Sequence, residues 1–138
     1  MPLALNAQST LDAWHRMVAA RDLSQVATLC APGAVFRSPV AHTPYEGAAL
    51  VAAFLQQAAG AFEDFRYHRT FVSGERDVVL EFSATVGGKQ VKGIDMIRFD
   101  AEGLFQDFEV MVRPASGLQA LGAEMARRMA PLLGAKPA

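Results

Sequence analysis

Apolar and polar positions change their period along the chain, from helical spacing near the start to alternation beyond residue 64. In the first segment Leu11, Trp14 and Val18 recur every three or four residues, which is typical of an amphipathic helix. Similar apolar spacing returns in three later segments. The pattern predicts helices over residues 9–21, 23–30, 48–59 and 116–133.

Polar and small residues mark the expected ends of these helices. Asp22, with Gln25 three residues later, predicts an N-cap for the second helix, and Ser116 with Gln119 predicts a capping box for the last one. Gly60 predicts the end of the third helix, because glycine readily adopts the left-handed conformation that follows many helices.

Four long segments with alternating polarity follow the third helix and predict strands joined by short turns. The Gly87-Gly88 pair is a strong hairpin signal, because both central residues of a two-residue turn need positive φ. A shorter strand precedes the third helix, and a loop with two prolines separates the two. The strands are expected at residues 34–37, 65–72, 78–86, 89–99 and 104–113, and the loop at residues 40–47.

This order of elements predicts one α+β domain over residues 1–138, with a core at about 9–114 and a C-terminal helix at about 116–133. Helices that precede an antiparallel meander pack on one face of it. A strongly curved sheet closed by helices makes a cone with an apolar interior. Such an interior leaves room for a small, largely apolar ligand.

One acid interrupts the apolar face of the strand at residues 89–99. Alternation places Val91, Gly93, Asp95, Ile97 and Phe99 on the same face of that strand. If this face lines the interior, Asp95 lies among aliphatic and aromatic side chains. Burial there disfavours the charged carboxylate, so we expect its pKa to be raised.

The sequence alone allows several interpretations of the chemistry of Asp95. A protonated Asp95 donates a hydrogen bond to a ligand oxygen, whereas an ionised one acts as a base or pairs with a cation. A purely structural Asp95 instead bonds to an internal hydroxyl, to the indole of Trp14 or to a water molecule.

Composition and charge narrow the classes of partner. Thirteen basic and fourteen acidic residues nearly cancel without a basic stripe, so we expect no binding to nucleic acid or to an anionic membrane. Cys30 is the only cysteine, and His15, His42 and His68 lack metal-ligand spacing, so no metal is expected. There is no Gly-rich phosphate loop, and we expect no cofactor. The absence of a signal-like or membrane-spanning run predicts a cytoplasmic protein.

Several short motifs, in this order, resemble those of SnoaL-like proteins of the nuclear transport factor 2-like superfamily. The resemblance implies a cone-shaped barrel with an apolar cavity, often dimerised through the outer face of the sheet. We therefore expect a homodimer in which Ile94, Met96 and Met111 contribute apolar surface. The matching motifs are Ala20–Leu23, Phe36–Pro39, Tyr45–Gly47, Ile94–Phe99, Asp100–Gly103 and Val112–Pro114.

Ketosteroid isomerases are the nearest mechanistic model within this resemblance. They use an aspartate base and an oxyanion hole made of a tyrosine and a protonated aspartate. Asp95 matches the oxyanion-hole aspartate, Trp14 stands at the tyrosine position, and Ser38 stands at the position of the base. Serine is a far weaker base. His42, in the loop that would rim the cavity, is therefore the candidate for that role.

Two other members of the superfamily match less well. Limonene-epoxide hydrolases need an arginine two residues before the aspartate and a second aspartate on the last strand, where this chain has Gly93 and Val110. For polyketide cyclases the nearest acid candidates are Asp107 and Glu109, which alternation places on the outer face.

Three functions follow as hypotheses. The first is an enzyme that transfers protons on a small carbonyl compound, in an isomerisation, cyclisation or dehydration, with Asp95 and His42 as catalytic residues. The second is a non-catalytic protein that binds a hydrophobic ligand, and the third is a dimeric interaction module. The side chains expected to contact the ligand are Trp14, Ser38, Phe54, Phe82, Ile97, Phe108, Val110 and Val112.

Overall fold

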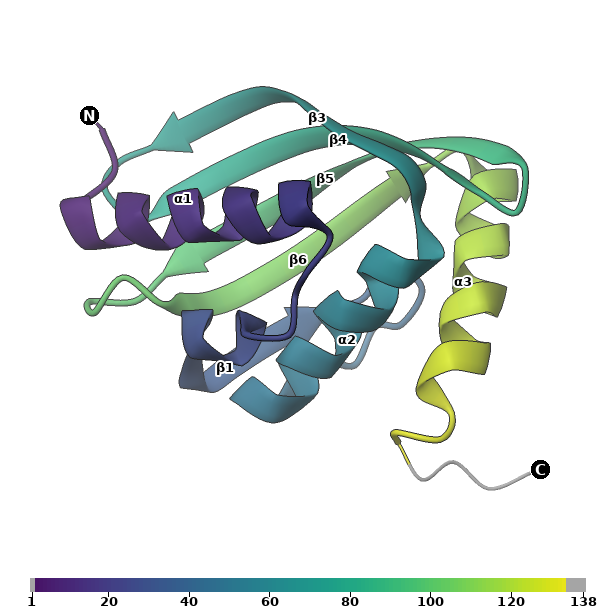
Figure 1. The fold of residues 1–138 in the computed structure, drawn as a ribbon, viewed down its shortest axis with the longest axis horizontal. Coiled ribbons are helices and arrows are strands. Elements are labelled where there is room, and N and C mark those ends of the chain that lie inside the picture. Colours follow the sequence, from purple (N-terminus) through teal and green to yellow (C-terminus); the bar gives the residue numbers. More distant parts are fainter. Residues whose placement is uncertain (1, 134–138) are drawn as a thin grey trace.

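Six strands and three α-helices make up residues 2–133, the part of the chain that the computed structural model describes (Figure 1). The helices are α1 (Leu5–Ala20), α2 (Ala48–Ala61) and α3 (Ala115–Met129), with a 3-10 turn η1 (Val26–Leu29). The strands are β1 (Cys30–Arg37), β2 (Tyr45–Glu46), β3 (Glu63–Ser73), β4 (Asp77–Val86), β5 (Lys89–Phe99) and β6 (Phe105–Arg113). The predicted α+β class is confirmed.

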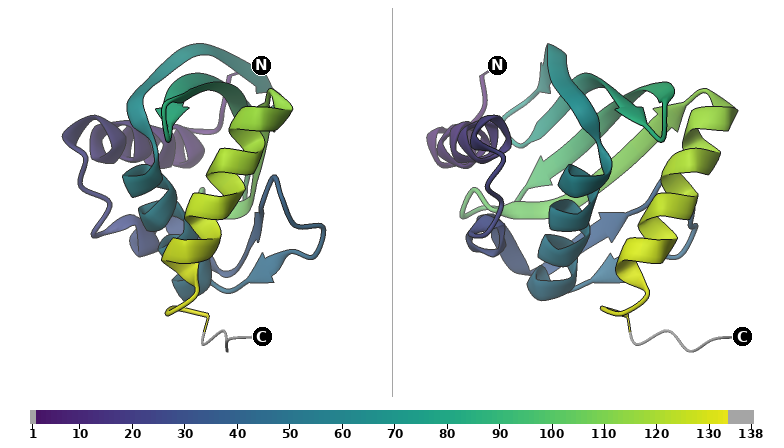
Figure 2. Two further views of the ribbon diagram at one scale, coloured as in Figure 1. Left: turned by 90° about the vertical axis from the view of Figure 1, so that its right-hand side faces the viewer. Right: turned by 45° about the vertical axis from the view of Figure 1, so that its right-hand side comes forward.

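The strands form one curved sheet in the order β2-β1-β6-β5-β4-β3. Strands β3 to β6 are the predicted antiparallel meander, whereas β1 pairs with β6 in parallel. Helices α1 and α2 lie across one face of the sheet, and α3 stands at the end near the β4–β5 hairpin (Figure 1). In the other views α3 packs beside α2 (Figure 2).

Several predicted boundaries and caps are wrong, and local hydrogen bonds explain part of the difference. The Asp22 carboxylate accepts hydrogen bonds from the backbone and hydroxyl of Ser24, which makes a turn and caps no α-helix. The helix predicted at 23–30 is therefore only the turn η1, and Cys30 already begins β1. Helix α3 begins after Pro114 without a side-chain cap, so the predicted capping box does not form.

The remaining differences concern the lengths of elements. Helix α1 begins at Leu5, four residues before the predicted start, and α2 continues past Gly60 to Ala61. The loop predicted at residues 40–47 contains the short strand β2, which pairs with β1 through Val35 and Phe36. Strand β1 begins earlier than predicted, at Cys30, which pairs with Phe105 of β6; after an irregularity the pairing resumes at Val35.

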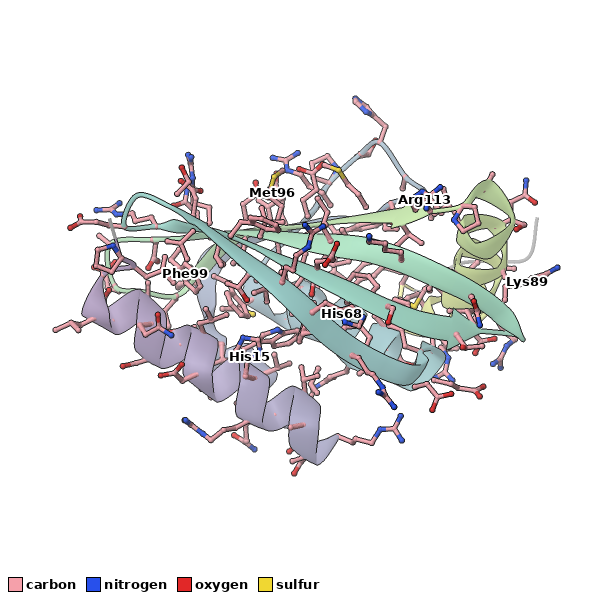
Figure 3. The ribbon with its side chains drawn as sticks, turned by 90° about the horizontal axis from the view of Figure 1, so that it is seen from above. His15, His68, Lys89, Met96, Phe99 and Arg113 are labelled. Atoms are coloured by element: carbon pink, nitrogen blue, oxygen red, sulfur yellow. The ribbon has the colours of Figure 1, made fainter. Side chains whose placement is uncertain are left out.

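The two faces of the sheet differ as the alternation predicted. On β5, residues 91, 93, 95, 97 and 99 are buried, and the residues between them are exposed or partly so. Figure 3 shows Phe99 on the side of the sheet that faces α1 and Met96 on the opposite side. Asp95 therefore points to the covered, concave face.

Candidate functional site

A cavity of about 550 Å³ lies between the concave face of the sheet and the three helices. Its walls are largely aromatic and aliphatic, and its volume falls in the range of small-molecule sites. Aromatic side chains contribute from α1 (Trp14), α2 (Phe54), β1 (Phe36), β3 (Phe65 and Tyr67) and β6 (Phe108), with Phe62 at the turn between α2 and β3.

A chain of two hydrogen bonds crosses one wall of this cavity. The indole Nε1–H of Trp14 donates to the hydroxyl oxygen of Tyr67 at 2.9 Å. The Tyr67 hydroxyl in turn donates to Oδ2 of Asp95 at 2.5 Å. An indole nitrogen only donates, so the Tyr67 hydroxyl must accept the hydrogen bond from Trp14 and donate its single hydrogen to Asp95. The direction of the chain is thus fixed from α1 through β3 to β5.

Burial raises the pKa of Asp95 from 3.8 to about 7, although the hydrogen bond from Tyr67 favours the carboxylate and opposes the shift. The pKa of Tyr67 is raised well above its usual value, first by burial and then by the charge of Asp95. Tyr67 therefore stays protonated as a donor, while both forms of Asp95 are populated near neutral pH.

The second carboxylate oxygen of Asp95, Oδ1, is the one available to a ligand. Tyr67 is the only side-chain partner of this carboxyl among residues 2–133, and it bonds to Oδ2. No fully buried side-chain oxygen or nitrogen in the described part of the chain lacks a hydrogen-bond partner. Oδ1 must therefore reach the cavity, which Asp95 lines.

Five of the eight predicted ligand contacts line the cavity, namely Trp14, Ser38, Phe54, Phe108 and Val110. The other three face inward but do not line it. Phe82 is covered by Phe65, which stacks on it at 4.9 Å between ring centroids. Ile97 is fully buried in the apolar core. Val112 lines a neighbouring depression instead.

His42 also lies in that neighbouring depression, with Arg37, Glu109 and Met111, and is not among the residues that line the main cavity. Ser38, Pro39 and Val110 border both spaces and so separate His42 from the cavity. The Ser38 hydroxyl oxygen accepts a hydrogen bond from the backbone of Val40 at 3.2 Å. The structure thus does not bring His42 together with Asp95.

Tyr67 is the main residue of the site that the sequence reasoning did not include. It alternates with His68, whose ring bonds to the Ser83 hydroxyl on the other face of the sheet. In register Tyr67 lies opposite Phe82, and Asp95 lies opposite Leu80. The alternation within residues 65–72 could have identified Tyr67, because it places Tyr67 on the same face as Phe65.

The mouth of the cavity is formed by those lining residues that are exposed. Arg21 and Ser24 follow α1, Gln56 lies on α2, and Glu63 begins β3. Gln56 donates to the backbone oxygen of Leu23 and so ties α2 to the segment after α1. Polar groups gather at the mouth, whereas Asp95 is a buried acid in the apolar depth.

Other classes of site find no support in residues 2–133. No three His, Cys, Asp or Glu side chains there come close enough to hold a metal ion. The helices of the same segment are too short or too polar to cross a membrane. Cys30 is buried, which raises the pKa of its thiol to about 11 and leaves it unreactive.

Comparison with protein families shows where this architecture belongs. The SnoaL-like domain matches residues 11–108, which is well over half of the chain and spans β1 to β5 and the first part of β6. The chain belongs to the SnoaL-like family. The family resemblance given by the motifs is thereby confirmed.

Two solved structures are similar to this SnoaL-like protein along nearly its whole length. A steroid delta-isomerase from Pseudomonas aeruginosa is 58% identical, with a TM-score of 0.92 over 97% of this chain and 98% of that one. A protein of uncharacterised function with a cystatin-like fold, from Silicibacter pomeroyi, is 34% identical, with a TM-score of 0.84 over 91% and 90% of the two chains.

More distant structures share the fold alone. A nuclear transport factor 2-like protein of unknown function from Mesorhizobium loti is 16% identical, with a TM-score of 0.69 over 79% of this chain and 92% of that one. Among curated protein sequences, none matches this chain.

Proposed function

We propose that this SnoaL-like protein binds a small, largely apolar compound in the cavity and transfers a proton on it through Asp95. The observation that carries the proposal is a buried carboxyl with one oxygen held by Tyr67 and the other open to an aromatic cavity. The similarity to a protein described as a steroid delta-isomerase supports a rigid carbonyl compound as the ligand.

A carboxyl with a pKa near 7 can both take and return a proton at neutral pH. In an isomerisation the carboxylate form of Asp95 takes a proton from the carbon beside the ligand carbonyl. The resulting acid returns the same proton to another carbon of the conjugated system, so the double bond moves and no proton is consumed. Cyclisation and dehydration need proton transfers of the same kind.

Non-catalytic ligand binding is the second candidate, and one observation favours it. Asp95 and Glu63 are the carboxyl groups lining the cavity within residues 2–133, and Glu63 is exposed at the mouth. Ser38 stands where ketosteroid isomerases carry their base. A cavity with a single buried acid holds a ligand oxygen well but supplies no second group for the reaction.

A rate measurement and a binding measurement together separate the two candidates. A Δ5-3-ketosteroid is mixed with the wild-type protein, and formation of the conjugated enone is followed by absorbance. We expect turnover that Asp95→Asn lowers by about 100-fold or more. Glu63→Gln, which removes a carboxylate at the mouth, is the matched control and should keep the wild-type rate.

Calorimetry with the conjugated product completes the test. Saturable binding that Asp95→Asn weakens, without any turnover by the wild type, supports the binding candidate and excludes the enzyme. Absence of both turnover and binding in the wild type would overturn the proposed function altogether.

A further inference from the structure

One wall of the cavity comes from outside the segment that matches the SnoaL-like domain. That match ends at residue 108, and α3 begins at Ala115. Leu121, Gly122 and Met125 of α3 nevertheless line the cavity. Figure 2 shows α3 beside α2, at the end of the sheet that carries the β4–β5 hairpin. Helix α3, which follows the matched segment, therefore completes the cavity.

Two glycines let the backbone of α3 lie directly on its neighbours. A Cβ atom at Gly117 would lie 2.4 Å from Cγ1 of Val91 on β5, and one at Gly122 would lie 3.0 Å from Cγ1 of Val40. Both distances are too short for an ordinary contact. The helix thus sits so close to the sheet and to the loop after β1 that a side chain at either position would force its neighbour to shift.

Polar contacts hold the other end of α3. The guanidinium of Arg128 donates to the backbone oxygen of Gly60, at the end of α2, at 3.0 Å. The same guanidinium donates to Glu124 one turn earlier at 2.5 Å. Met129, next to Arg128, is buried in the core. Helix α3 is therefore held along its length, and its backbone keeps Met125 at a fixed place on the cavity wall.

We infer that Met125 sets the size of the ligand that this cavity accepts. Its side chain is partly buried and lines the cavity. It packs against two groups of buried apolar side chains, one that includes Phe108 and one that includes Leu121. Asp95 lies on the central part of β5, whereas α3 contacts that strand near its start, at Val91. A ligand with its carbonyl end at Asp95 extends its apolar end toward α3 and meets the Met125 thioether.

This inference rests on the proposed function, because it assigns the other end of the same ligand site. Met125 would discriminate among rigid fused-ring compounds of different size. Methionine is flexible and polarisable, and so it fits several such rings. A bulky, rigid side chain at position 125 would shorten the cavity without touching Asp95 or Tyr67.

The test compares two phenols of different length, 2-naphthol and estradiol, by calorimetry with the full-length protein. Met125→Trp is expected to weaken estradiol binding about tenfold or more relative to 2-naphthol, because the indole occupies the far end of the cavity. Met125→Ala should move the ratio of the two affinities in the opposite direction. Ala126→Trp places the same indole on an exposed position of α3 and should leave the ratio unchanged.

The outcomes separate this inference from the proposed function. An affinity ratio that stays at the wild-type value in both folded Met125 variants would overturn the role of Met125, while the ligand site itself would stand. If the wild-type protein binds neither phenol, the proposed function fails and the inference fails with it.

Discussion

The two oxygens of the Asp95 carboxyl have different surroundings, and this difference determines what the residue can do. Oδ2 accepts the hydrogen bond from Tyr67, which Trp14 orients through its own donated hydrogen bond. Oδ1 is the oxygen that meets the ligand in the function we propose. The structural and the ligand-binding interpretations of Asp95, both left open by the sequence, are therefore compatible. Asp95 bonds to an internal hydroxyl and still presents one oxygen to the cavity.

The raised pKa of Asp95 predicts a specific dependence of stability on pH. The folded protein binds this proton more tightly than the unfolded chain, because the pKa rises from 3.8 to about 7 on folding. Stability is therefore lost as the pH rises through this window, by roughly 4 kcal/mol in total. Asp95→Asn carries no such charge. Its free energy of unfolding in urea, relative to that of the wild type, should therefore increase between about pH 4 and 7.

Tyr67→Phe is the control for this prediction. Without the hydroxyl, the carboxylate of Asp95 loses its donor, so its pKa should rise further and the loss of stability should extend to higher pH. The indole N–H of Trp14 also loses its acceptor, which costs roughly 1–3 kcal/mol at every pH. A difference between Asp95→Asn and the wild type that does not vary with pH would contradict the assignment.

At the scale of elements, Gly93 shows how closely β5 packs against its neighbours. A Cβ atom there would lie 2.5 Å from both Cζ of Phe82 and the backbone oxygen of Met111. The arginine that limonene-epoxide hydrolases need at this position therefore has no room. Gly93→Ala should lower the free energy of unfolding by about 1–3 kcal/mol, as measured by urea denaturation.

Gly33 on β1 is the matched control, since nothing lies within 4 Å of a Cβ atom built there. Gly33→Ala should leave stability unchanged or raise it by about 0.4–1 kcal/mol, because alanine restricts the unfolded chain. Equal stability of both variants would mean that β5 can move away from Phe82, against the packing described above.

The alternation of polar and apolar residues predicted most of the strands. The predictions fail where tertiary contacts determine the structure. The alternation on β5 was enough to turn Asp95 inward. It did not bring Tyr67 to Asp95, because that contact depends on the register of β3 on β4, which shifts between Tyr67 and Thr70. Nor does an inward direction mean access to the cavity, as the covered Phe82 demonstrates.

The parallel pairing of β1 with β6 was also beyond the sequence pattern. The register joins Phe36 to Phe108, two residues far apart in the chain, and no local signal encodes it. The contribution of α3 to the cavity could not be predicted for the same reason. Its apolar stripe indicated a buried face, but only the folded chain shows that Leu121 and Met125 face a cavity.

For the molecule as a whole, the convex face of the sheet carries exposed apolar side chains. Phe71, Met96 and Met111 are 50%, 39% and 43% exposed. Ion pairs between Arg98 and Asp77, and between Arg69 and Glu81, lie on the same face. An apolar patch rimmed by charges is typical of a protein interface, so we expect two copies to pair through this face.

Met96→Glu should shift this pairing toward the monomer, because it places a charge in the centre of the patch. We expect the dissociation constant of the dimer to rise by about tenfold or more, as measured by light scattering over a concentration series. Leu5→Glu, at an 88% exposed position on α1, is the control and should leave the dimer intact. A wild-type protein that is monomeric at tens of micromolar would contradict the expected pairing.

Trp14 has a consequence for observing the protein as well as for its chemistry. It is the only tryptophan in the chain. Its ring meets Phe105 and Phe108 edge-on, bonds to Tyr67 and borders the cavity. Any molecule that enters the cavity changes the surroundings of the one indole that emits light in this protein. The intrinsic fluorescence therefore reports occupancy of the cavity without an attached dye.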